Sequence, residues 1–383
     1  MHPHNQTPPP VHPHGHTHSH GHPHGQAKTY VPRLVAWEVT RRCNLKCKHC
    51  RAMAMDKPYP GEFNTQECFQ ILDNIRTLGQ PIIILTGGEP MYREDIYDIA
   101  AYGTKIGLRM VLAPCGHSVT PESVHKMKES GIMRISLSLD GYNAEMHDHF
   151  RQVAGSYDSI INACHVAKEH GMEFQINTTI TKHNYKDIEK IFNLAVELGA
   201  VGYHPFLLVP TGRGKEMADM EITPEEYENV LRWFYENSRN TPIHLKPTCA
   251  PHYYRIFRQL EKENGRTVTP ETHGLDAMTK GCMGGQSFAF ISHVGKVQIC
   301  GFLETEAGDL RQNNLDFAGV WNHSQLFQEM RNLNEYHGRC GVCEYRMVCG
   351  GCRARANATT GHYLDEEPYC VYEPAAMKKE KQQ

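Results

Sequence analysis

Arg42-Cys43-Asn44-Leu45-Lys46-Cys47-Lys48-His49-Cys50 is the stretch that decides the fold and the chemistry of this chain. Its cysteines follow the spacing C-x3-C-x2-C, which offers three thiolates to a metal centre that usually takes four. A [4Fe–4S] cluster held by three protein sulfurs keeps one iron open, and an open iron can bind a small molecule directly. The alternative is structural zinc, which usually shows C-x2-C pairs and four protein ligands. The spacing therefore favours an iron–sulfur cluster.

The composition is typical of a large enzyme. With 383 residues the chain can bury a sizeable core in about two domains, and its net charge of −3 predicts no nucleic-acid partner. No apolar run reaches the ~18 residues that span a membrane, and no apolar secretion signal opens the chain. Fourteen cysteines then predict metal ligation in a reducing compartment, which we expect to be the cytoplasm.

Residues 1–29 form a segment of their own. Nine histidines between His2 and His24 alternate with Pro, Gly, Ser and Thr. The segment has almost nothing apolar to bury, so we expect it to be disordered. Its imidazoles suit loose binding of Ni²⁺, Zn²⁺ or Cu²⁺, and a dispensable tail is the alternative interpretation. A short charged tail is expected at 376–383.

Between Leu34 and about Pro210 the chain alternates β-rich runs with amphipathic helical patterns. The expected strands are Leu34–Thr40, Ile82–Leu85, Arg109–Ala113, Arg134–Leu139, Phe174–Thr179 and Gly202–Leu208. The expected helices lie near Thr65–Leu78, Ile96–Ile106, Pro121–Ser130, Ser156–His170, Tyr185–Leu198 and Pro224–Asn237. Six β/α units in a row predict an α/β fold, a partial (β/α)6 TIM barrel over 30–240. A small cysteine-rich domain should follow over 241–375.

A second motif, Thr86-Gly87-Gly88-Glu89-Pro90, follows the second expected strand. In parallel α/β folds the site is built from loops at the carboxyl ends of strands. Gly87 and Gly88 let backbone approach a ligand closely, and the carboxylate of Glu89 can accept from an ammonium group. Alone, this would be an ordinary turn. One strand after the cysteine loop, it supports a binding site.

Both motifs resemble those of the radical S-adenosylmethionine (SAM) enzymes, whose fold is a partial barrel. The resemblance implies a [4Fe–4S] cluster whose open iron chelates the amino and carboxylate groups of SAM. One electron from the cluster then cleaves SAM into methionine and a 5′-deoxyadenosyl radical. By the same resemblance the Gly87–Pro90 turn binds the methionine amine. His49 stands where the family usually carries an aromatic residue beside the adenine.

Later strand ends supply further SAM contacts by this resemblance. Ser136, Ser138 and Asp140 close the fourth expected strand, where the family often contacts the ribose, and a polar strand end with an Asp-Gly turn is the alternative. The other expected SAM contacts are Arg151 for the carboxylate, Asn177 in the fifth strand, and Val209 beside the adenine unless it is plain core. Three cysteines without partner spacing are interpreted as buried thiols: Cys68, Cys115 and Cys164.

Eight further cysteines gather near the C-terminus, enough for two fully ligated [4Fe–4S] clusters. Their pattern resembles the SPASM extension of radical SAM enzymes, in which ligands interleave. The resemblance assigns Cys249, Cys282, Cys300 and Cys352 to one auxiliary cluster, and Cys340, Cys343, Cys349 and Cys370 to another. Peptide- and sulfatase-modifying members commonly space the last pair by three residues where this chain has two. A different interleaving of the ligands and a zinc site over 340–352 are therefore the alternatives. We expect one or two auxiliary clusters in electron transfer.

Longer segments resemble the heme synthase of the siroheme-dependent, alternative heme pathway. They are Arg33–Glu38, Pro81–Thr86, Leu207–Gly214, Thr248–Tyr254, Thr272–Met278, Gly350–Ala356 and Glu366–Cys370. The resemblance implies that iron-coproporphyrin III is the substrate, and that two of its propionates are oxidatively decarboxylated to vinyl groups, giving protoheme. It also implies a low-potential electron donor such as flavodoxin or ferredoxin.

A substrate with four carboxylates needs basic side chains near the barrel mouth. Arg213 is the first choice; Arg41, Arg42, Arg353 and Arg355 are others, each alternatively a solvated charge. The residues that could meet the porphyrin or its iron, or simply pack beside Cys249, are His252, Tyr253 and Tyr254.

Three other functions stay open at this point. One is the sister enzyme that converts 12,18-didecarboxysiroheme to iron-coproporphyrin III, and another is a SPASM enzyme that modifies peptides. A non-enzymatic iron–sulfur or metal carrier would explain the histidines and cysteines but not the Gly87–Pro90 turn.

Overall fold

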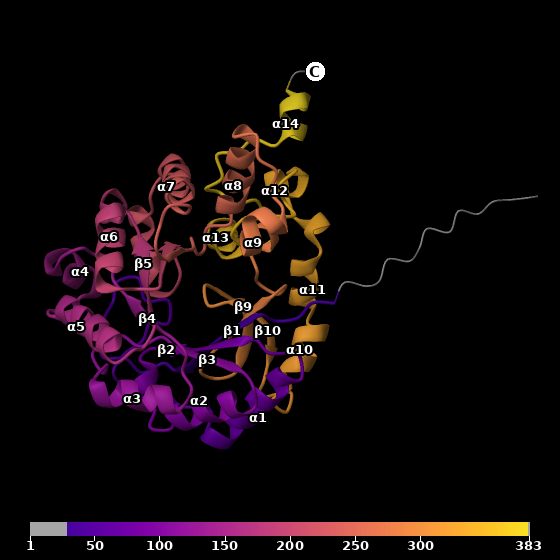
Figure 1. The fold of residues 1–383 in the computed structure, drawn as a ribbon. Coiled ribbons are helices and arrows are strands. Elements are labelled where there is room, and N and C mark those ends of the chain that lie inside the picture. Colours follow the sequence, from indigo (N-terminus) through magenta and orange to yellow (C-terminus); the bar gives the residue numbers. More distant parts are fainter. Residues whose placement is uncertain (1–28, 382–383) are drawn as a thin grey trace, which may run out of the picture. The chain divides into compact units, whose positions relative to one another are not determined.

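The computed structural model describes residues 29–381 and divides the chain into two compact units, Met1–Tyr30 and Val31–Gln383. All helices and strands named below belong to the second unit (Figure 1). The expected histidine-rich tail lies outside the described residues, apart from its last residue. Among residues 29–381, no helix has the length and apolar character needed to cross a membrane.

One ten-stranded sheet is the frame of this unit, in the order β10-β9-β8-β1-β2-β3-β4-β5-β6-β7. Seven strands pair in parallel: β1 (Leu34–Thr40), β2 (Ile82–Gly87), β3 (Arg109–Leu112), β4 (Ile135–Ser138), β5 (Phe174–Ile180), β6 (Gly202–Leu207) and β7 (His244–Leu245). Three strands from the cysteine-rich part extend the other edge: β8 (Phe288–Ile291), β9 (Lys296–Cys300) and β10 (Leu303–Asp309). Strand β8 is parallel to β1, whereas β9 and β10 are antiparallel.

Helices connect successive parallel strands and lie along the outer side of the sheet (Figure 1). They are α1 (Thr65–Arg76), α2 (Ile96–Lys105), α3 (Pro121–Glu129), α4 (Ala144–Arg151), α5 (Ser156–Glu169), α6 (Ile188–Leu198) and α7 (Pro224–Asn237). Capping boxes open three of them, at Asn64, Thr120 and Thr223. In each box a side chain satisfies backbone N–H groups that the first helical turn leaves without partners.

The order of strands and helices confirms the expected α/β class. Each of the six expected strands begins and ends within two residues of an observed one, because long apolar runs between turn residues mark buried parallel strands well. Helix α4 was not predicted from the sequence. It has only eight residues, and Asn143 caps it by accepting a hydrogen bond from the Met146 N–H at 2.9 Å.

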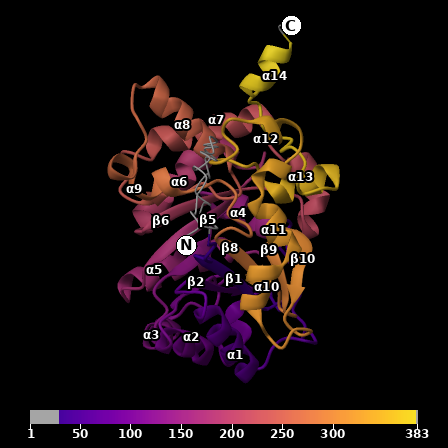
Figure 2. The ribbon, with the colours of Figure 1, turned by 90° about the vertical axis from the view of Figure 1, so that its right-hand side faces the viewer.

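The cysteine-rich part closes both edges of the parallel sheet. Strand β7 follows the expected domain border at residue 240 and pairs with β6, while β8 pairs with β1. The remaining helices belong to this part: α8 (His252–Glu263), α9 (Pro270–Met278), α10 (Phe317–His323), α11 (Gln325–Arg331), α12 (Gly338–Val342), α13 (Arg353–Thr360) and α14 (Ala375–Glu380). Figure 2 shows β8, β9 and β10 beside β1. The division into two domains therefore stays a prediction, since one sheet runs through both.

A buried carboxylate joins three segments at the β1–β8 junction. Glu38 of β1 is fully buried, and Arg51 Nη1 and Arg41 Nε donate to its oxygens at 2.7 and 3.0 Å. His293 Nδ1, from the turn between β8 and β9, lies 2.9 Å away. Burial alone would raise the pKa of Glu38, but Arg51, His293 and Arg41 together lower it to about 2. The carboxylate is therefore ionised and ties the cysteine loop to both strands.

Replacing Glu38 by Gln should lower the free energy of unfolding by about 3 kcal/mol, because it leaves buried cations without their counter-charge. Anaerobic urea denaturation followed by far-ultraviolet circular dichroism measures this. The matched control is Glu173→Gln, which removes a carboxylate from an exposed pair with Arg134 and should cost less than about 1 kcal/mol. Equal losses in the two variants would refute the structural role of Glu38.

Candidate active site

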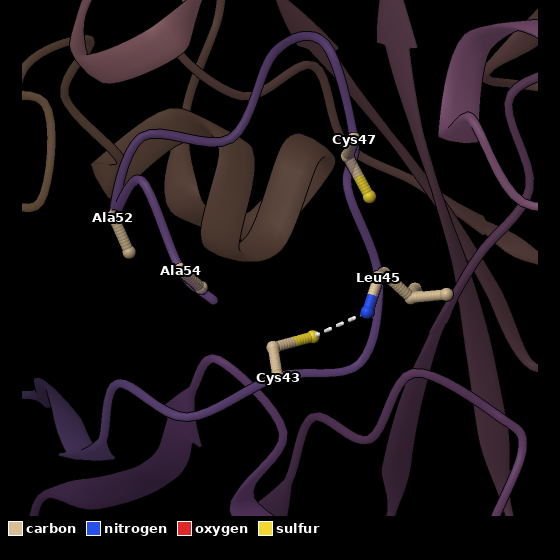
Figure 3. Close-up of a cluster of buried hydrophobic side chains, with 5 residues drawn as sticks. All are labelled: Cys43, Leu45, Cys47, Ala52 and Ala54. Atoms are coloured by element: carbon tan, nitrogen blue, oxygen red, sulfur yellow. Dashed lines mark hydrogen bonds between the residues drawn. The ribbon is translucent and has the colours of Figure 1, made fainter. Parts of the chain in front are cut away.

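The cysteine loop leaves the carboxyl end of β1 and has no regular secondary structure of its own. Cys43 and Cys47 are buried and Cys50 is half-buried. Figure 3 shows the first two thiols beside Ala52 and Ala54, with the Leu45 N–H donating to Cys43 Sγ at 3.4 Å. Burial raises the pKa of Cys43 to about 12. Buried thiols gathered in this way favour a bound cationic centre, which stabilises the thiolates.

The Gly87–Pro90 turn braces the start of this loop. The Gly88 N–H donates to Thr40 O at 2.8 Å and the Glu89 N–H to Arg42 O at 2.7 Å. A Cβ atom on Gly88 would lie 2.3 Å from Arg42 O, and one on Gly87 would lie 2.1 Å from Thr40 O. Glycine is required at these two positions because two backbone segments touch there. This reason is additional to the one expected from the sequence, which is close approach of a ligand to the backbone.

The segment after β6 braces the end of the loop. The Arg213 N–H donates to Cys50 O at 3.0 Å, and its guanidinium donates to Cys47 O and Ala54 O, both at 2.9 Å. The remaining nitrogen, Nη2, is buried without a hydrogen-bond partner in the described part of the chain. Gly212 must be glycine, since a Cβ there would lie 2.2 Å from Arg51 O. Arg213 thus holds the loop and keeps one donor for a ligand.

A cavity with an empty volume of about 1150 Å³ opens at this end of the barrel. Most of the predicted site residues line it: Cys43, Cys47, Cys50, His49, Gly87, Gly88, Ser136, Ser138, Arg151, Asn177, Val209 and Arg213. Two predicted SAM contacts, Glu89 and Asp140, do not line it, and neither do the later cysteines or the other candidate substrate residues: Arg41, Arg42, His252, Tyr253, Tyr254, Arg353 and Arg355. The fold therefore brings the thiols, the glycine turn and the later strand ends to one cavity. This was expected, because the carboxyl ends of parallel strands meet at the same end of a barrel.

Glu89 has a different surrounding from the one expected of an amine ligand. Its carboxylate is fully buried and accepts from the Met91 N–H at 2.9 Å and the Cys115 N–H at 2.5 Å. Burial raises the pKa of Glu89. The carboxylate ties the turn after β2 to the end of β3, and its predicted role in binding the SAM amine stays untested.

Arg151, which lines the cavity, forms a buried ion pair with Asp140, which does not. Arg151 Nε donates to Asp140 Oδ2 at 2.6 Å, and Asp140 Oδ1 accepts from the Thr179 N–H at 2.7 Å. Burial alone would raise the pKa of Asp140, but the Arg151 guanidinium holds it below its ordinary value. Arg151 also approaches Cys47 Sγ at 3.6 Å. The sequence did not distinguish Ser138 from Asp140 as a candidate ribose contact. In the structure Ser138 lines the cavity, whereas Asp140 does not.

His49 presents a neutral ring to the cavity. It stacks on Phe150 with ring centroids 4.5 Å apart and planes at 14°. Burial lowers the pKa of His49 to about 3, so the ring is uncharged near neutral pH. Helix α4 supplies both Phe150 and Arg151, so this short helix matters for the site although the sequence pattern did not reveal it.

Sequence reasoning also missed several wall residues. The wall includes Arg51, Cys115, Thr179, Phe206, Leu208 and Phe302. Arg51 follows Cys50 directly, and this position in the sequence could have indicated that it lies at the site. Its guanidinium lies 4.4 Å from the centroid of the Phe290 ring. Cys115 was interpreted as an incidental thiol, whereas it lines the cavity with the three cysteines of the loop.

The later cysteines lie in two groups, and the clusters expected on them stay predictions. Cys340, Cys343, Cys349 and Cys370 line one cavity with an empty volume of about 400 Å³. Cys249, Cys282, Cys300 and Cys352 lie close enough for the charge of each to act on its neighbours, and together with burial this raises the pKa of Cys300 to about 12 and of Cys352 to about 11.

Their spacing also bears on the zinc alternative. In a zinc tetrathiolate with Zn–S bonds of about 2.3 Å, neighbouring sulfurs lie about 3.8 Å apart. Among residues 29–381, no three cysteine sulfurs lie within 4.8 Å of one another. Thiols that bind four different irons of a cubane need this wider separation. The assignment of the two groups to [4Fe–4S] clusters stays a prediction, with zinc as the alternative.

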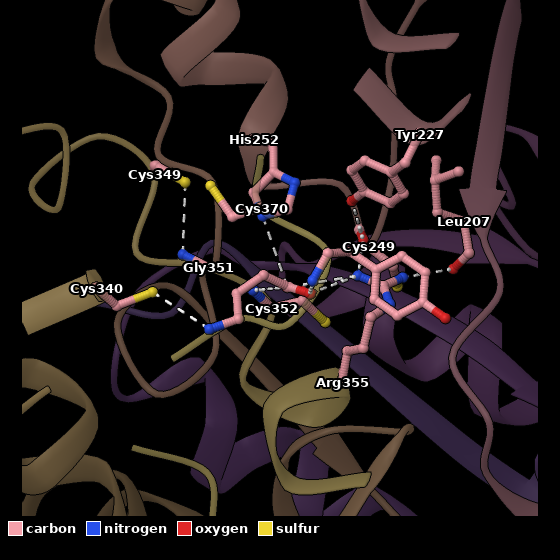
Figure 4. A network of polar contacts seen from close by, with 12 residues as sticks. Leu207, Tyr227, Cys249, His252, Cys340, Cys349, Gly351, Cys352, Arg355 and Cys370 are labelled. Atoms are coloured by element: carbon pink, nitrogen blue, oxygen red, sulfur yellow. Dashed lines mark hydrogen bonds and ion pairs between the residues drawn. The ribbon is translucent and has the colours of Figure 1, made fainter. Parts of the chain in front are cut away.

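Arg355 joins the group of Cys249, Cys282, Cys300 and Cys352 to the barrel wall (Figure 4). This fully buried guanidinium donates to Leu208 O at 2.9 Å and lies 3.4 Å from Glu367 Oε2. Glu367 in turn accepts from the Cys352 N–H at 2.6 Å. Arg355 also donates to the carbonyl oxygen of Cys249, a residue held at a φ of +54° that non-glycine residues rarely adopt.

The expected substrate residues outside the barrel cavity have other surroundings. His252 and Tyr253 are buried in α8, and His252 lines the cavity of Cys340 and its group. Arg41 pairs with Glu38, Arg42 with Asp56, and Arg353 donates to the carbonyl oxygens of Tyr363 and Asp365. Their expected roles toward a substrate stay predictions; of the arginines named from the sequence as substrate ligands, Arg213 lines the barrel cavity.

Comparison with known proteins identifies the family. A family model described as the radical SAM superfamily matches residues 37–195. The AdoMet-dependent heme synthase of Nitratidesulfovibrio vulgaris is 51% identical over 345 residues, which are 90% of this chain and 94% of that relative. The enzyme of the same name from Methanosarcina barkeri is 49% identical over 348 residues, 91% and 99% of the two chains. The chain belongs to the AdoMet-dependent heme synthase family of radical SAM enzymes.

More distant relatives give the background to this assignment. The Fe-coproporphyrin III synthase of Methanosarcina barkeri is 31% identical over 355 residues, 88% of this chain and 87% of that one. Streptococcus suis SuiB bound to S-adenosylmethionine shares the fold, with a TM-score of 0.71, 16% identity, and coverage of 90% and 78%. The expected superfamily and fold are confirmed. This radical SAM enzyme therefore uses SAM and a [4Fe–4S] cluster, while the role of each site residue stays a prediction.

Arg151→Gln should weaken SAM binding by about tenfold, because it removes a cation that faces the cavity beside Cys47. Equilibrium dialysis of the iron-loaded, anaerobic protein with SAM measures the dissociation constant, and iron content shows that the clusters are retained. Arg134→Gln, at an exposed pair, is the control and should bind SAM normally. Unchanged affinity in Arg151→Gln would exclude Arg151 as a SAM ligand.

Proposed function

We propose that this chain converts iron-coproporphyrin III into protoheme by changing two propionates into vinyl groups. The observation that carries the proposal is the difference in sequence identity to two related enzymes. The chain is 49% identical to the heme synthase and 31% identical to the Fe-coproporphyrin III synthase of one organism, Methanosarcina barkeri, over similar lengths. The sister reaction is therefore the less favoured candidate.

The chemistry is balanced for each propionate. When bound at the cluster, SAM supplies a 5′-deoxyadenosyl radical, at the expense of one electron from a low-potential donor of the flavodoxin or ferredoxin class. The propionate β-carbon loses a hydrogen atom to this radical. The C–C bond to the carboxylate breaks, CO₂ leaves, one electron passes to an acceptor, and a vinyl group remains. One electron enters and one leaves, so the acceptor must be a one-electron centre.

The cavity offers what a flat, acidic macrocycle needs. Its walls carry apolar side chains from the barrel and from the cysteine-rich part, including Phe206 of β6 and Phe302 between β9 and β10. Three guanidinium groups line it, those of Arg51, Arg151 and Arg213. Guanidinium groups bind carboxylates through two parallel hydrogen bonds. Apolar walls exclude water from the reacting carbon, and fixed cations orient it.

Two of these arginines are our choice for the substrate propionates. Arg213 keeps its buried Nη2 free of partners among the described residues, and the other guanidinium nitrogens fix its direction. Arg51 lies between the cysteine loop and Gly301, where an added Cβ would be 2.9 Å from Arg51 Nε. Arg151 is closer to Cys47 and is paired with Asp140, which suits the SAM carboxylate better.

The two groups of later cysteines are our choice for the electron acceptor. We propose that Cys249, Cys282, Cys300 and Cys352 hold one auxiliary [4Fe–4S] cluster, and Cys340, Cys343, Cys349 and Cys370 another. Arg355 supports a route from the cavity to the first of these, since it binds Leu207 O and Leu208 O, whose residues line the cavity, and Cys249 O. Protein-bound clusters span about −700 to +450 mV, so they can accept this electron.

Anaerobic incubation with SAM, dithionite and iron-coproporphyrin III should yield protoheme through a mono-vinyl intermediate, detected by mass spectrometry. About two molecules of 5′-deoxyadenosine should form per heme, because each propionate loses one hydrogen atom to one radical. Conversion of acetate to methyl groups on 12,18-didecarboxysiroheme, with iron-coproporphyrin III left unchanged, would assign the chain to the sister reaction instead.

Cys352→Ala should slow vinyl formation more than SAM cleavage, because electron removal follows radical formation. The ratio of heme to 5′-deoxyadenosine measures this difference. Cys164→Ala, at a buried thiol of α5, is the matched control and should leave the ratio unchanged. An unchanged ratio in Cys352→Ala would remove the auxiliary cluster from the proposed reaction.

A further inference from the structure

Two imidazoles and a carboxylate converge in the cysteine-rich part, away from the thiols. His337 precedes α12, and His362 and Asp365 lie in the loop after α13. One ligand atom from each lies within 4.8 Å of the other two. His337 Nδ1 is 2.8 Å and His362 Nδ1 is 3.9 Å from Asp365 Oδ1. An ordinary surface ion pair needs one imidazole, whereas here a second imidazole approaches the same carboxylate oxygen.

The two imidazole rings are also oriented alike. Their centroids lie 5.4 Å apart and their planes differ by 20°. Rings placed in this way can each turn one nitrogen toward a cation that they share with the carboxylate. His362 Nδ1 accepts a hydrogen bond from the Leu364 N–H at 3.2 Å, and a nitrogen that accepts carries a lone pair.

Backbone contacts fix the two segments without help from these three side chains. The His337 N–H donates to Leu364 O at 2.9 Å. Arg353, which is fully buried, donates from Nη1 to Tyr363 O at 3.1 Å and to Asp365 O at 2.7 Å. The ligand frame therefore exists before any ion arrives, and side-chain rotation alone is needed to complete it.

We propose that His337, His362 and Asp365 bind a divalent transition-metal ion of the Zn²⁺ or Fe²⁺ class. Imidazole and carboxylate together suit these ions better than Mg²⁺ or Ca²⁺, which prefer oxygen ligands alone. Three protein ligands leave a coordination position for water, and the side chains are 56%, 49% and 32% exposed, so water has access.

An ion at this site would clamp the segments that carry two of the later cysteines. His337 lies three residues before Cys340, and Asp365 lies five residues before Cys370. Arg353, which holds the loop of Asp365, also donates from Nη2 to Cys340 Sγ at 3.5 Å. The site is thus placed to stabilise the region around the second group of cysteines.

Residue-resolved labelling of histidines tests the proposal in the full-length, cluster-loaded protein. The nine histidines of residues 1–24 are also expected to suit loose Zn²⁺ binding, so total zinc content does not report this site. Diethyl pyrocarbonate labelling, mapped by peptide mass spectrometry, reports each imidazole separately. With micromolar Zn²⁺, labelling of His337 and His362 should fall about fivefold or more, while cluster absorbance stays constant. His125, exposed beside the single carboxylate of Glu129, is the internal control and should keep its reactivity.

Asp365→Asn provides the decisive variant, because both reporter imidazoles remain. The amide removes the anionic ligand, so Zn²⁺ should no longer protect His337 or His362. Asp158→Asn, at an exposed position of α5, should leave the protection intact. Equal labelling of His337 and His362 with and without Zn²⁺ would overturn the proposal, and so would protection that survives in Asp365→Asn.

Discussion

The binding of Arg213 to the cysteine loop is the constraint on which the rest of the site depends. The cysteine loop forms neither a helix nor a strand, so its carbonyl groups need partners from elsewhere. Arg213 supplies N–H groups to Cys50, Cys47 and Ala54 from the segment after β6, and the turn at Gly88 does the same at the start of the loop. The barrel must therefore bring the second and sixth strand ends together before the thiols have a fixed arrangement.

A second constraint links the barrel to the cysteine-rich part. Strand β8 continues the sheet beside β1, and Glu38 holds the cysteine loop and the β8–β9 turn to that junction. On the far side, Arg355 binds both the carbonyls of Leu207 and Leu208 and that of Cys249. The cavity wall and the later cysteines are thus parts of one structure, which is the arrangement that electron removal from a bound substrate requires.

Much of this was predictable from the sequence, and the exceptions have physical reasons. Apolar runs bounded by turns located the six strands, because local pattern determines them. The membership of the two later cysteine groups came from the resemblance to the SPASM extension, and their ligand roles stay predictions. Helix α4 is too short to show a clear hydrophobic period in the sequence. The sequence therefore did not reveal that Phe150 and Arg151 belong to one helix. The predicted SAM contacts of Glu89 and Asp140 stay predictions, and their carboxylates accept from the Cys115 and Thr179 N–H groups, which lie far away in the sequence. Such long-range partners leave no trace in a single sequence.

The central claim is that the thiols of Cys43, Cys47 and Cys50 form the centre at which SAM is cleaved, separately from the later cysteines. The most direct measurement is 5′-deoxyadenosine formation by a variant with all three replaced by Ala, incubated anaerobically with SAM and dithionite. The account predicts that this variant forms no 5′-deoxyadenosine above the protein-free background, while it keeps the iron bound by the later cysteines. Formation of 5′-deoxyadenosine at a rate comparable to that of the unmodified chain would contradict it.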